Sequence, residues 1–276
     1  MKEHLKTLLQ HCEHTHQARC ILREYLQART LEFLQYKGAF ANWAFVGGTA
    51  LRFLYSLPRF SEDLDFSATK ESSEADFVDY LRAVKLGFER ELYAVAIKAK
   101  PEKTVQSAFL KFPGLLHELN LSGQESEVLS IKIEVDTHPP KGWTCENTVV
   151  RRHSMLNLNH YTKPSLLAGK VHALLSRSYT KGRDYYDLLW YLTGQEQLEP
   201  NFIQLNNALL QTGWNGPALH LGNWRALLVE RVNTTDFKKV VEDVDPFLEK
   251  KEESSLLTQA NFIKLLSSGL TPPPSV

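Results

Sequence analysis

The stretch FVGGTALRFLYSLPRFSEDLDF, residues 45–66, places a glycine pair, a threonine and two aspartates close together in the chain. The apolar run at residues 43–46 predicts a short strand, and the residues from Thr49 predict a helix that Pro58 closes. Residues 64–67 predict a second strand. This order of strand, glycine turn, helix and strand would bring the turn and the aspartates side by side in one sheet.

Two carboxylates in this position suit a site for a divalent cation. Side chains alternate along a strand, so Asp63 and Asp65 should share one exposed face, with Cα atoms roughly 6.5–7 Å apart. Mg²⁺ prefers carboxylate and phosphate oxygens, and a pair of such ions can activate an attacking hydroxyl. Gly47 and Gly48 would let the backbone approach a phosphate, and Thr49 would offer a hydroxyl and a backbone NH. The pattern predicts a metal and nucleotide site.

A simpler interpretation stays open for each half of this motif. A glycine pair is typical of a tight turn with Thr49 as a helix N-cap, and two alternate aspartates are typical of a solvated strand face. A third carboxylate would come from VLSIKIEVD, residues 128–136, whose alternation predicts a strand with Glu134 and Asp136 on its polar face. Three facing acids repel unless a cation lies between them, whereas Glu134 alone would pair with Lys132.

A second cluster of charged residues lies on two helices predicted within residues 163–192. Lys170 on the first helix could neutralise a triphosphate, and Arg183 at the start of the second could clamp another anion. Asp184 complements the helix dipole, and Asp187 could orient Lys170 or accept a proton from an attacking hydroxyl. The simpler interpretation is a helical hairpin held by solvated ion pairs, with Arg183 and Asp187 paired at i, i+4.

The overall composition narrows the class of protein. Acidic and basic residues balance at 32 each, so no global charge attracts nucleic acid. Three scattered cysteines without a CxxC spacing argue against a disulfide framework and for a reducing environment. No apolar run is long enough for a signal peptide or a membrane span, so we expect a cytoplasmic protein without membrane contact. Six basic residues fit either a local nucleic-acid groove or a solvated surface: Lys98, Lys100, Lys103, Lys111, Arg151 and Arg152.

The predicted elements fall into two domains, a mixed helix and strand domain at residues 1–155 and a helical domain at residues 156–276. The first domain begins with helices predicted within residues 3–36, the last of which ends at Gly38. The run GGTALRFLYSLPRFSEDLDFS resembles the signature of the nucleotidyltransferase superfamily that includes DNA polymerase beta. More narrowly, RFSEDLDF at residues 59–66 is similar to the acid-pair motif of the AbiEii/AbiGii toxin family of type IV toxin–antitoxin and abortive-infection systems. The later KIE matches the third-strand motif of that family, which favours Glu134 over Asp136.

The resemblance implies an α+β fold, in which a nucleotidyltransferase-like mixed sheet flanked by helices is followed by a helical C-terminal domain that completes the nucleotide site. It implies an enzyme that uses Mg²⁺, or Mn²⁺, to transfer a nucleoside monophosphate from a nucleoside triphosphate. The implied acceptor is an RNA, the 3′ end of tRNA, and the consequence is a block of translation. The implied partner is a cognate antitoxin encoded alongside, often a transcriptional repressor.

The resemblance also implies roles for individual residues, because a lysine on one helix and an RDxxD-like element on the next are features of this family. The implied catalytic residues are Asp63, Asp65, Lys170 and Asp187, and the implied metal ligands are Asp63, Asp65 and Glu134. The implied nucleotide-binding residues are Gly47, Gly48, Thr49, Arg59, Lys170, Arg183 and Asp184.

Other functions remain open on the sequence alone. An enzyme that modifies a small molecule, as antibiotic nucleotidyltransferases do, predicts a compact acidic pocket. An RNA acceptor instead needs a basic groove that leads to Asp63. Nucleotide transfer to a protein is a further alternative. A catalytically silent binding module is also conceivable, although nothing structural requires both aspartates.

Overall fold

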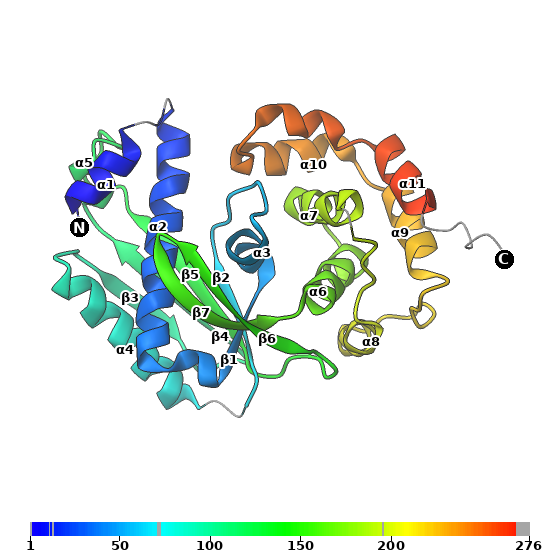
Figure 1. Cartoon of the computed structure of the whole chain (residues 1–276), viewed down its shortest axis with the longest axis horizontal. Helices are drawn as coiled ribbons and strands as arrows, with labels where there is room; N and C mark the ends of the chain where they lie inside the picture. Colours follow the sequence, from blue (N-terminus) through cyan, green and yellow to red (C-terminus); the bar gives the residue numbers. More distant parts are fainter. Residues whose placement is uncertain (1, 11, 13, 71–72, 195, 269–276) are drawn as a thin grey trace. The chain divides into compact units, whose positions relative to one another are not determined.

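The structure is a computed structural model that describes residues 2–10, 12, 14–70, 73–194 and 196–268. The chain divides into two compact units, whose elements are drawn in sequence colours in Figure 1. The first unit comprises Met1–Ser56, Phe60–Pro139 and Cys145–His160, and the second comprises Leu57–Arg59, Pro140–Thr144 and Tyr161–Val276.

The first unit contains a seven-stranded sheet with the strand order β3-β4-β5-β2-β1-β7-β6. β1 (Trp43–Val46) pairs antiparallel with β2 (Leu64–Ala68), and β2 pairs parallel with β5 (Leu129–Asp136). The remaining strands are β3 (Ala96–Lys100), β4 (Val105–Phe112), β6 (Cys145–Arg152) and β7 (Ser154–Tyr161). Because parallel and antiparallel pairs occur together, the sheet is mixed, and the predicted α+β class is confirmed.

The two faces of this sheet differ in burial, because side chains alternate along each strand. The even-numbered residues of β4 are buried, and among them the Phe112 ring meets Phe88 of α4 (Glu74–Arg90) edge to face. Phe88 also meets Phe33 of α2 (Thr15–Lys37), so α2 and α4 cover this face (Figure 1). The odd-numbered residues of β4 and the even-numbered residues of β5 line the opposite face.

Local signals fix the ends of the helices in the first unit. α2 ends at Gly38, whose left-handed backbone has a φ of 83°, as the sequence predicts. α4 begins with a capping box, because Ser73 and Asp76 each accept a hydrogen bond from the backbone NH of the other. α3 spans Gly47–Tyr55 and therefore begins before the predicted Thr49, with Val46 as its N-cap residue. The shorter helical segments are α1 (Lys2–Leu9), η1 (Ala39–Ala41) and α5 (Leu115–Glu118).

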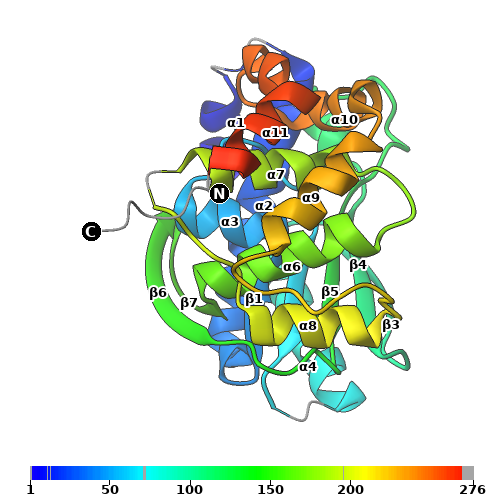
Figure 2. The ribbon, with the colours of Figure 1, turned by 90° about the vertical axis from the view of Figure 1, so that its right-hand side faces the viewer.

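The second unit is helical in its described part, and Figure 2 shows its helices from the side. The helices are α6 (Lys163–Ser176), α7 (Gly182–Thr193), α8 (Phe202–Gln211), α9 (Trp224–Asn233), α10 (Phe237–Val244) and α11 (Gln259–Ser268), with short turns η2 (Asp245–Phe247) and η3 (Lys251–Leu256). The rings of Tyr185, Phe237 and Phe262 pack together and join α7, α10 and α11. Arg59 forms an isolated β-bridge with Leu248, which ties Leu57–Arg59 to this unit.

The helices predicted at the start of the chain and within residues 163–192 are confirmed, as are the strands β1, β2 and β5. β6 is not among the predicted elements. None of its residues is buried, so it lacks the apolar alternation by which a half-buried strand is recognised. Within the part of the chain that the structure describes, no helix is long and apolar enough to cross a membrane.

Candidate active site

The glycine turn and the acidic strand meet in the first unit. Gly47 begins α3 with a φ of 80°, a conformation that costs glycine little and other residues more. A Cβ atom added at Gly47 would overlap with the Oδ2 atom of Asp65, so the backbone of the turn lies directly against this carboxylate. The predicted convergence of the turn and Asp65 is therefore present.

The acidic residues lie along neighbouring strands. Asp65 on β2 is the parallel register partner of Glu134 on β5, so both side chains project from the same face of the sheet. Asp63 lies one position before β2, and both aspartates are half-buried rather than exposed as the sequence suggested. Asp136 is instead opposite Ser67, and this register favours Glu134 as the third carboxylate.

Lys132 adds a positive charge to the acidic group. Its Nζ atom lies 2.8 Å from Oε1 of Glu134, which is the ion pair expected if Glu134 acted alone. Burial alone would lower the pKa of Lys132, but the bond to Glu134 and the charges of Asp63 and Asp65 raise it. Lys132 is therefore held in its charged form beside the carboxylates.

The acidic side chains are of the kind that binds Mg²⁺, but their positions in this structure do not form a metal site. Asp63, Asp65 and Glu134 supply the hard oxygen ligands that Mg²⁺ prefers, and the missing side chain of Gly47 leaves room for the Asp65 carboxylate itself. Among the described residues, no group of three or more acidic, histidine or cysteine side chains is close enough together to hold a metal ion. The metal ligands thus remain a prediction.

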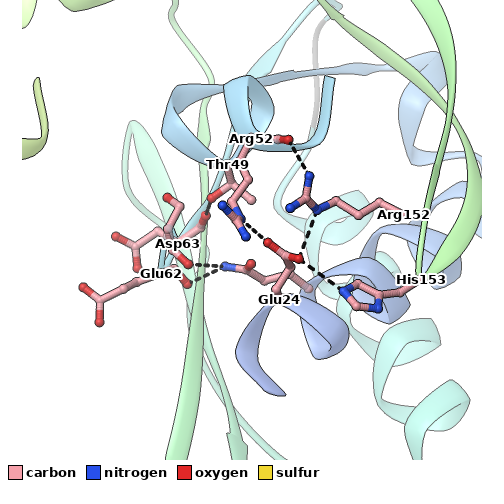
Figure 3. A network of polar contacts seen from close by, with 9 residues as sticks. Glu24, Thr49, Arg52, Glu62, Asp63, Arg152 and His153 are labelled. Carbon is pink, nitrogen blue, oxygen red and sulfur yellow. Dashed lines mark hydrogen bonds and ion pairs between the residues drawn. The ribbon is translucent and has the colours of Figure 1, made fainter. Parts of the chain in front are cut away.

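Thr49 and Gln27 fix the backbone that leads to the aspartates, and Figure 3 labels Thr49, Glu62 and Asp63. The Thr49 side chain is fully buried, and its hydroxyl donates to the carbonyl oxygen of Asp63. Nε2 of Gln27 on α2 donates to the carbonyl oxygens of Ser61 and Glu62, at 3.1 and 2.9 Å. The Thr49 hydroxyl therefore positions Asp63, and the structure gives no support to its predicted contact with a phosphate.

A buried ion-pair network centred on Glu24 of α2 joins three elements of the first unit (Figure 3). The Glu24 carboxylate pairs with Arg52 of α3, with Nε of Arg152 on β6 at 3.0 Å, and with Nε2 of His153 at 3.2 Å. Arg152 also donates to the backbone carbonyl of Arg52, at 3.0 Å. The network anchors α3, the helix that begins at Gly47, and it also takes Arg152 out of the predicted basic groove.

The Glu24 network predicts that the stability of the protein depends on pH. Burial alone would raise the pKa of Glu24, but His153, Arg52 and Arg152 lower it from 4.5 to about 2. Because the pKa is lower in the folded state, the contribution is complete above pH 4.5 and is lost as the pH falls toward 2. At about 1.36 kcal/mol per pH unit, Glu24→Gln should lower the free energy of unfolding by about 3 kcal/mol at neutral pH.

Urea unfolding of Glu24→Gln and the wild type across this pH range measures the effect. The difference between the two proteins should shrink as the pH falls. Glu89→Gln is the matched control, because Glu89 forms an exposed pair with Lys85 on α4, and it should change stability by less than about 0.5 kcal/mol. A difference that does not depend on pH would mean that the carboxylate charge of Glu24 is not the source of its contribution.

The second unit contains its own buried charge cluster. Nε and Nη2 of Arg59 each lie 2.6 Å from an oxygen of Asp187, in a bidentate pair. Nζ of Lys170 on α6 lies 2.7 Å from Oδ2 of Asp187 and 3.1 Å from Oδ1 of Asp184. Arg177 reaches Asp184 at 3.5 Å. Asp187 is fully buried, so the alternative of solvated ion pairs is wrong for this cluster.

The cluster stabilises the charged forms of Lys170 and Asp184. Burial alone would lower the pKa of Lys170, but Asp187 and Asp184 raise it above its ordinary value. Burial would raise the pKa of Asp184, but Lys170 and Arg177 lower it. Both oxygens of Asp187 are already bonded, so its geometry fits the orientation of Lys170 better than the acceptance of a proton.

The contacts of the Arg59 and Arg183 side chains differ from those that the sequence predicts. The Arg59 side chain is 2% exposed and is bonded to Asp187, so the structure does not support its predicted contact with a nucleotide. The Arg183 guanidinium lies 4.3 Å from the centre of the Phe247 ring, and the possible pair with Asp187 at i, i+4 is replaced by the pair with Arg59. The roles of Lys170, Arg183 and Asp184 in nucleotide binding remain predictions.

Comparison with known protein families matches residues 30–259 to the model described as nucleotidyl transferase AbiEii toxin, type IV TA system. The chain belongs to this family. It is therefore a nucleotidyltransferase of the toxin type, and membership of a type IV toxin–antitoxin family implies a cognate antitoxin. A search of curated proteins finds no match.

Solved structures share the fold at low sequence identity. JHP933 from Helicobacter pylori is 20% identical over 91% of this chain and 93% of its own, with a TM-score of 0.55. A putative nucleotidyltransferase from H. pylori is also 20% identical, over 91% and 96% of the two chains, with a TM-score of 0.57. MenT4, a nucleotidyltransferase toxin from Mycobacterium tuberculosis, is 14% identical over 99% and 91%, with a TM-score of 0.56.

The structure brings the predicted residues of this AbiEii-family protein together in two groups, one in each unit. The first group contains Gly47, Gly48, Thr49, Asp63, Asp65 and Glu134, and the second contains Arg59, Lys170, Arg183, Asp184 and Asp187. Sequence reasoning missed Glu24 and Gln27. Both are buried polar residues among the apolar positions of α2, and this break in the apolar pattern was the available signal.

Proposed function

We propose that this toxin transfers a nucleoside monophosphate from a nucleoside triphosphate to an RNA, with the 3′ end of tRNA as the acceptor, and that the modified tRNA no longer supports translation. The observation that carries the proposal is the contact of Gly47 with the Asp65 carboxylate, beside the register pair of Asp65 and Glu134. Because Gly47 has no side chain, the Asp65 carboxylate lies against the backbone of the turn, which places the glycine turn and the acidic strand at one site.

The residues of the first unit have separate tasks in this proposal. Asp63, Asp65 and Glu134 would hold Mg²⁺, which when bound activates the attacking hydroxyl and stabilises charge at the α-phosphorus. Thr49 and Gln27 hold the backbone at Asp63 and just before it, which gives the carboxylates a fixed position. The fixed position of the carboxylates matters because phosphoryl-type transfer depends mostly on orientation and electrostatics.

An RNA acceptor is favoured over a small molecule by the surroundings of Glu134. A small-molecule acceptor predicts a compact acidic pocket. Glu134 instead lines a groove of about 700 Å³ together with five lysines. A positively charged groove suits a polyanionic acceptor.

Incubation with each labelled nucleoside triphosphate, Mg²⁺, total cellular RNA and cellular protein tests the proposal. We expect label in RNA of tRNA size, its loss when EDTA removes the metal, and reduced protein synthesis from the treated tRNA in a cell-free translation reaction. Label found only in protein or in small molecules would overturn the acceptor. Label that enters RNA in the presence of EDTA would overturn the role of the metal.

A further inference from the structure

One surface of the first unit combines charge, shape and position beside the carboxylates. We call it the lysine groove, a depression of about 700 Å³ on the face of the sheet opposite α2 and α4. The residues that matter for its chemistry are Lys98, Lys100, Lys103, Lys111, Lys132 and Phe109.

The register of three strands explains why these side chains gather on one face. Lys98 of β3 is opposite Phe109 of β4, and Phe109 is opposite Lys132 of β5. Register partners on neighbouring strands project to the same side of a sheet. A second row runs from Lys100 through Ser107 of β4 to Glu134. Lys98, Lys100 and Lys132 are thus spaced over the sheet face, and Lys103 lies in the turn between β3 and β4.

The charge of the lysine groove is largely unopposed. Lys132 pairs with Glu134, but Lys98, Lys100, Lys103 and Lys111 have no ion pair with any acidic side chain in the described chain. All four are exposed. Because the whole chain carries equal numbers of acidic and basic residues, this local excess creates a positive surface that the net charge does not reveal.

The lysine groove is continuous with the candidate active site. The row of Lys100, Ser107 and Glu134 continues onto β2 at Asp65, the carboxylate against which Gly47 packs. Neighbouring strands are about 4.8 Å apart, so an anion bound at Lys100 would lie within about 15 Å of Asp65. A polyanion bound along the groove would therefore extend directly to the carboxylates of Glu134 and Asp65.

The dimensions and the aromatic residue suit a single strand of nucleic acid. The stretch of β4 from Val105 to Lys111 is roughly 20 Å long at about 3.4 Å per residue, which gives room for several linked phosphates rather than one. Phe109 is 38% exposed and stands between Lys98 and Lys132, where its ring offers a stacking surface for a base. An acidic protein partner would contact the lysines but would have no base to stack on the Phe109 ring.

We propose that the lysine groove binds the sugar-phosphate backbone of the single-stranded end of the RNA acceptor and directs its terminal hydroxyl toward Asp65, an inference that rests on the proposed function for the identity of the acceptor. The lysines neutralise the phosphates, and Phe109 stacks on one base. Binding by this surface is electrostatic and tolerant of sequence.

The test measures RNA binding by the full chain without any nucleoside triphosphate, so its result does not depend on transfer activity. The variant combines Lys98→Gln, Lys100→Gln, Lys103→Gln and Lys111→Gln, and the probe is a fluorescein-labelled single-stranded RNA followed by anisotropy over a series of salt concentrations. We expect weaker binding and a slope of log Kd against log salt that falls by roughly 2–3, at about 0.7 per lost phosphate contact.

A matched control carries the same loss of charge on exposed lysines elsewhere: Lys238→Gln, Lys239→Gln, Lys250→Gln and Lys264→Gln. This control should bind RNA with the affinity and the salt slope of the wild type. If both variants lose the same RNA affinity, net charge alone accounts for the change and the proposal is overturned. A groove variant that binds RNA like the wild type but escapes neutralisation by the antitoxin would assign the surface to a protein partner, which also overturns it.

Phe109→Ala separates stacking from charge. We expect about tenfold weaker RNA binding from the loss of one stacked base, with an unchanged salt slope, because no phosphate contact is removed. If the affinity is unchanged, the base does not stack on Phe109, and the single-strand assignment of the groove fails.

Discussion

Replacing Asp65 with asparagine is expected to lower nucleotide transfer by about 10²- to 10³-fold and to remove growth inhibition while leaving the fold intact. The side chain is half-buried, and asparagine keeps its shape, so the free energy of unfolding should change by no more than about 1 kcal/mol. The carboxylate charge against Gly47 is lost, and removal of one preorganised electrostatic contact typically lowers a rate by about 10²- to 10³-fold. Label transfer to RNA and a urea unfolding curve for the same preparation measure the two effects.

Asp136→Asn is the matched control for this variant. Asp136 is also a half-buried carboxylate that faces the same side of the sheet, but its register partner is Ser67 and its Oδ1 atom accepts from the backbone NH of His138, at 2.9 Å. Asparagine can accept the same hydrogen bond, so this variant should keep its activity. If Asp65→Asn unfolds the protein, or if Asp136→Asn loses activity to the same degree, the assignment of the carboxylates is wrong.

How much of this site the sequence can predict depends on how far apart in the chain the interacting residues lie. The glycine turn and the alternation of β5 are local, and the sequence predicts both correctly. The pairing of Asp65 with Glu134 depends on the parallel register of β2 and β5, which lie far apart in the chain. Alternation places Glu134 and Asp136 on the same face and does not distinguish them, whereas the resemblance of KIE to the family motif and the observed register both favour Glu134.

Arg59 shows how one sequence motif can contribute residues to two units. It precedes the two aspartates by only a few residues, and the resemblance of RFSEDLDF to the family motif implied a role for it in nucleotide binding. The segment Leu57–Arg59 belongs to the second unit, where the guanidinium is buried against Asp187. No local pattern reports such a change of unit within a short loop. The break in the apolar pattern of α2 could have singled out Glu24, but not its partners, because they lie on α3 and β6, far from α2 in the chain.

Asp187→Asn is expected to give the largest loss of stability in the second unit. Asp187 is fully buried and bonds both Arg59 and Lys170, so the variant removes the carboxylate charge from two buried cations at once. Removal of one partner from a buried ion pair costs about 3–5 kcal/mol, because the remaining charge stays desolvated. Urea unfolding followed by tryptophan fluorescence measures the change. Glu196→Gln, which removes an exposed pair with Lys163, should cost less than about 1 kcal/mol.

The same variant decides between the two roles that the sequence left open for Asp187. A carboxylate that orients Lys170 and holds Arg59 should lose stability and activity together when it becomes an amide. A carboxylate that accepts a proton from the attacking hydroxyl should lose activity alone, because only its basicity is needed. A folded Asp187→Asn protein with the unfolding midpoint of the wild type and no transfer activity would therefore restore the catalytic role. The bidentate contact with Arg59 occupies both carboxylate oxygens, and for this reason we expect the first outcome.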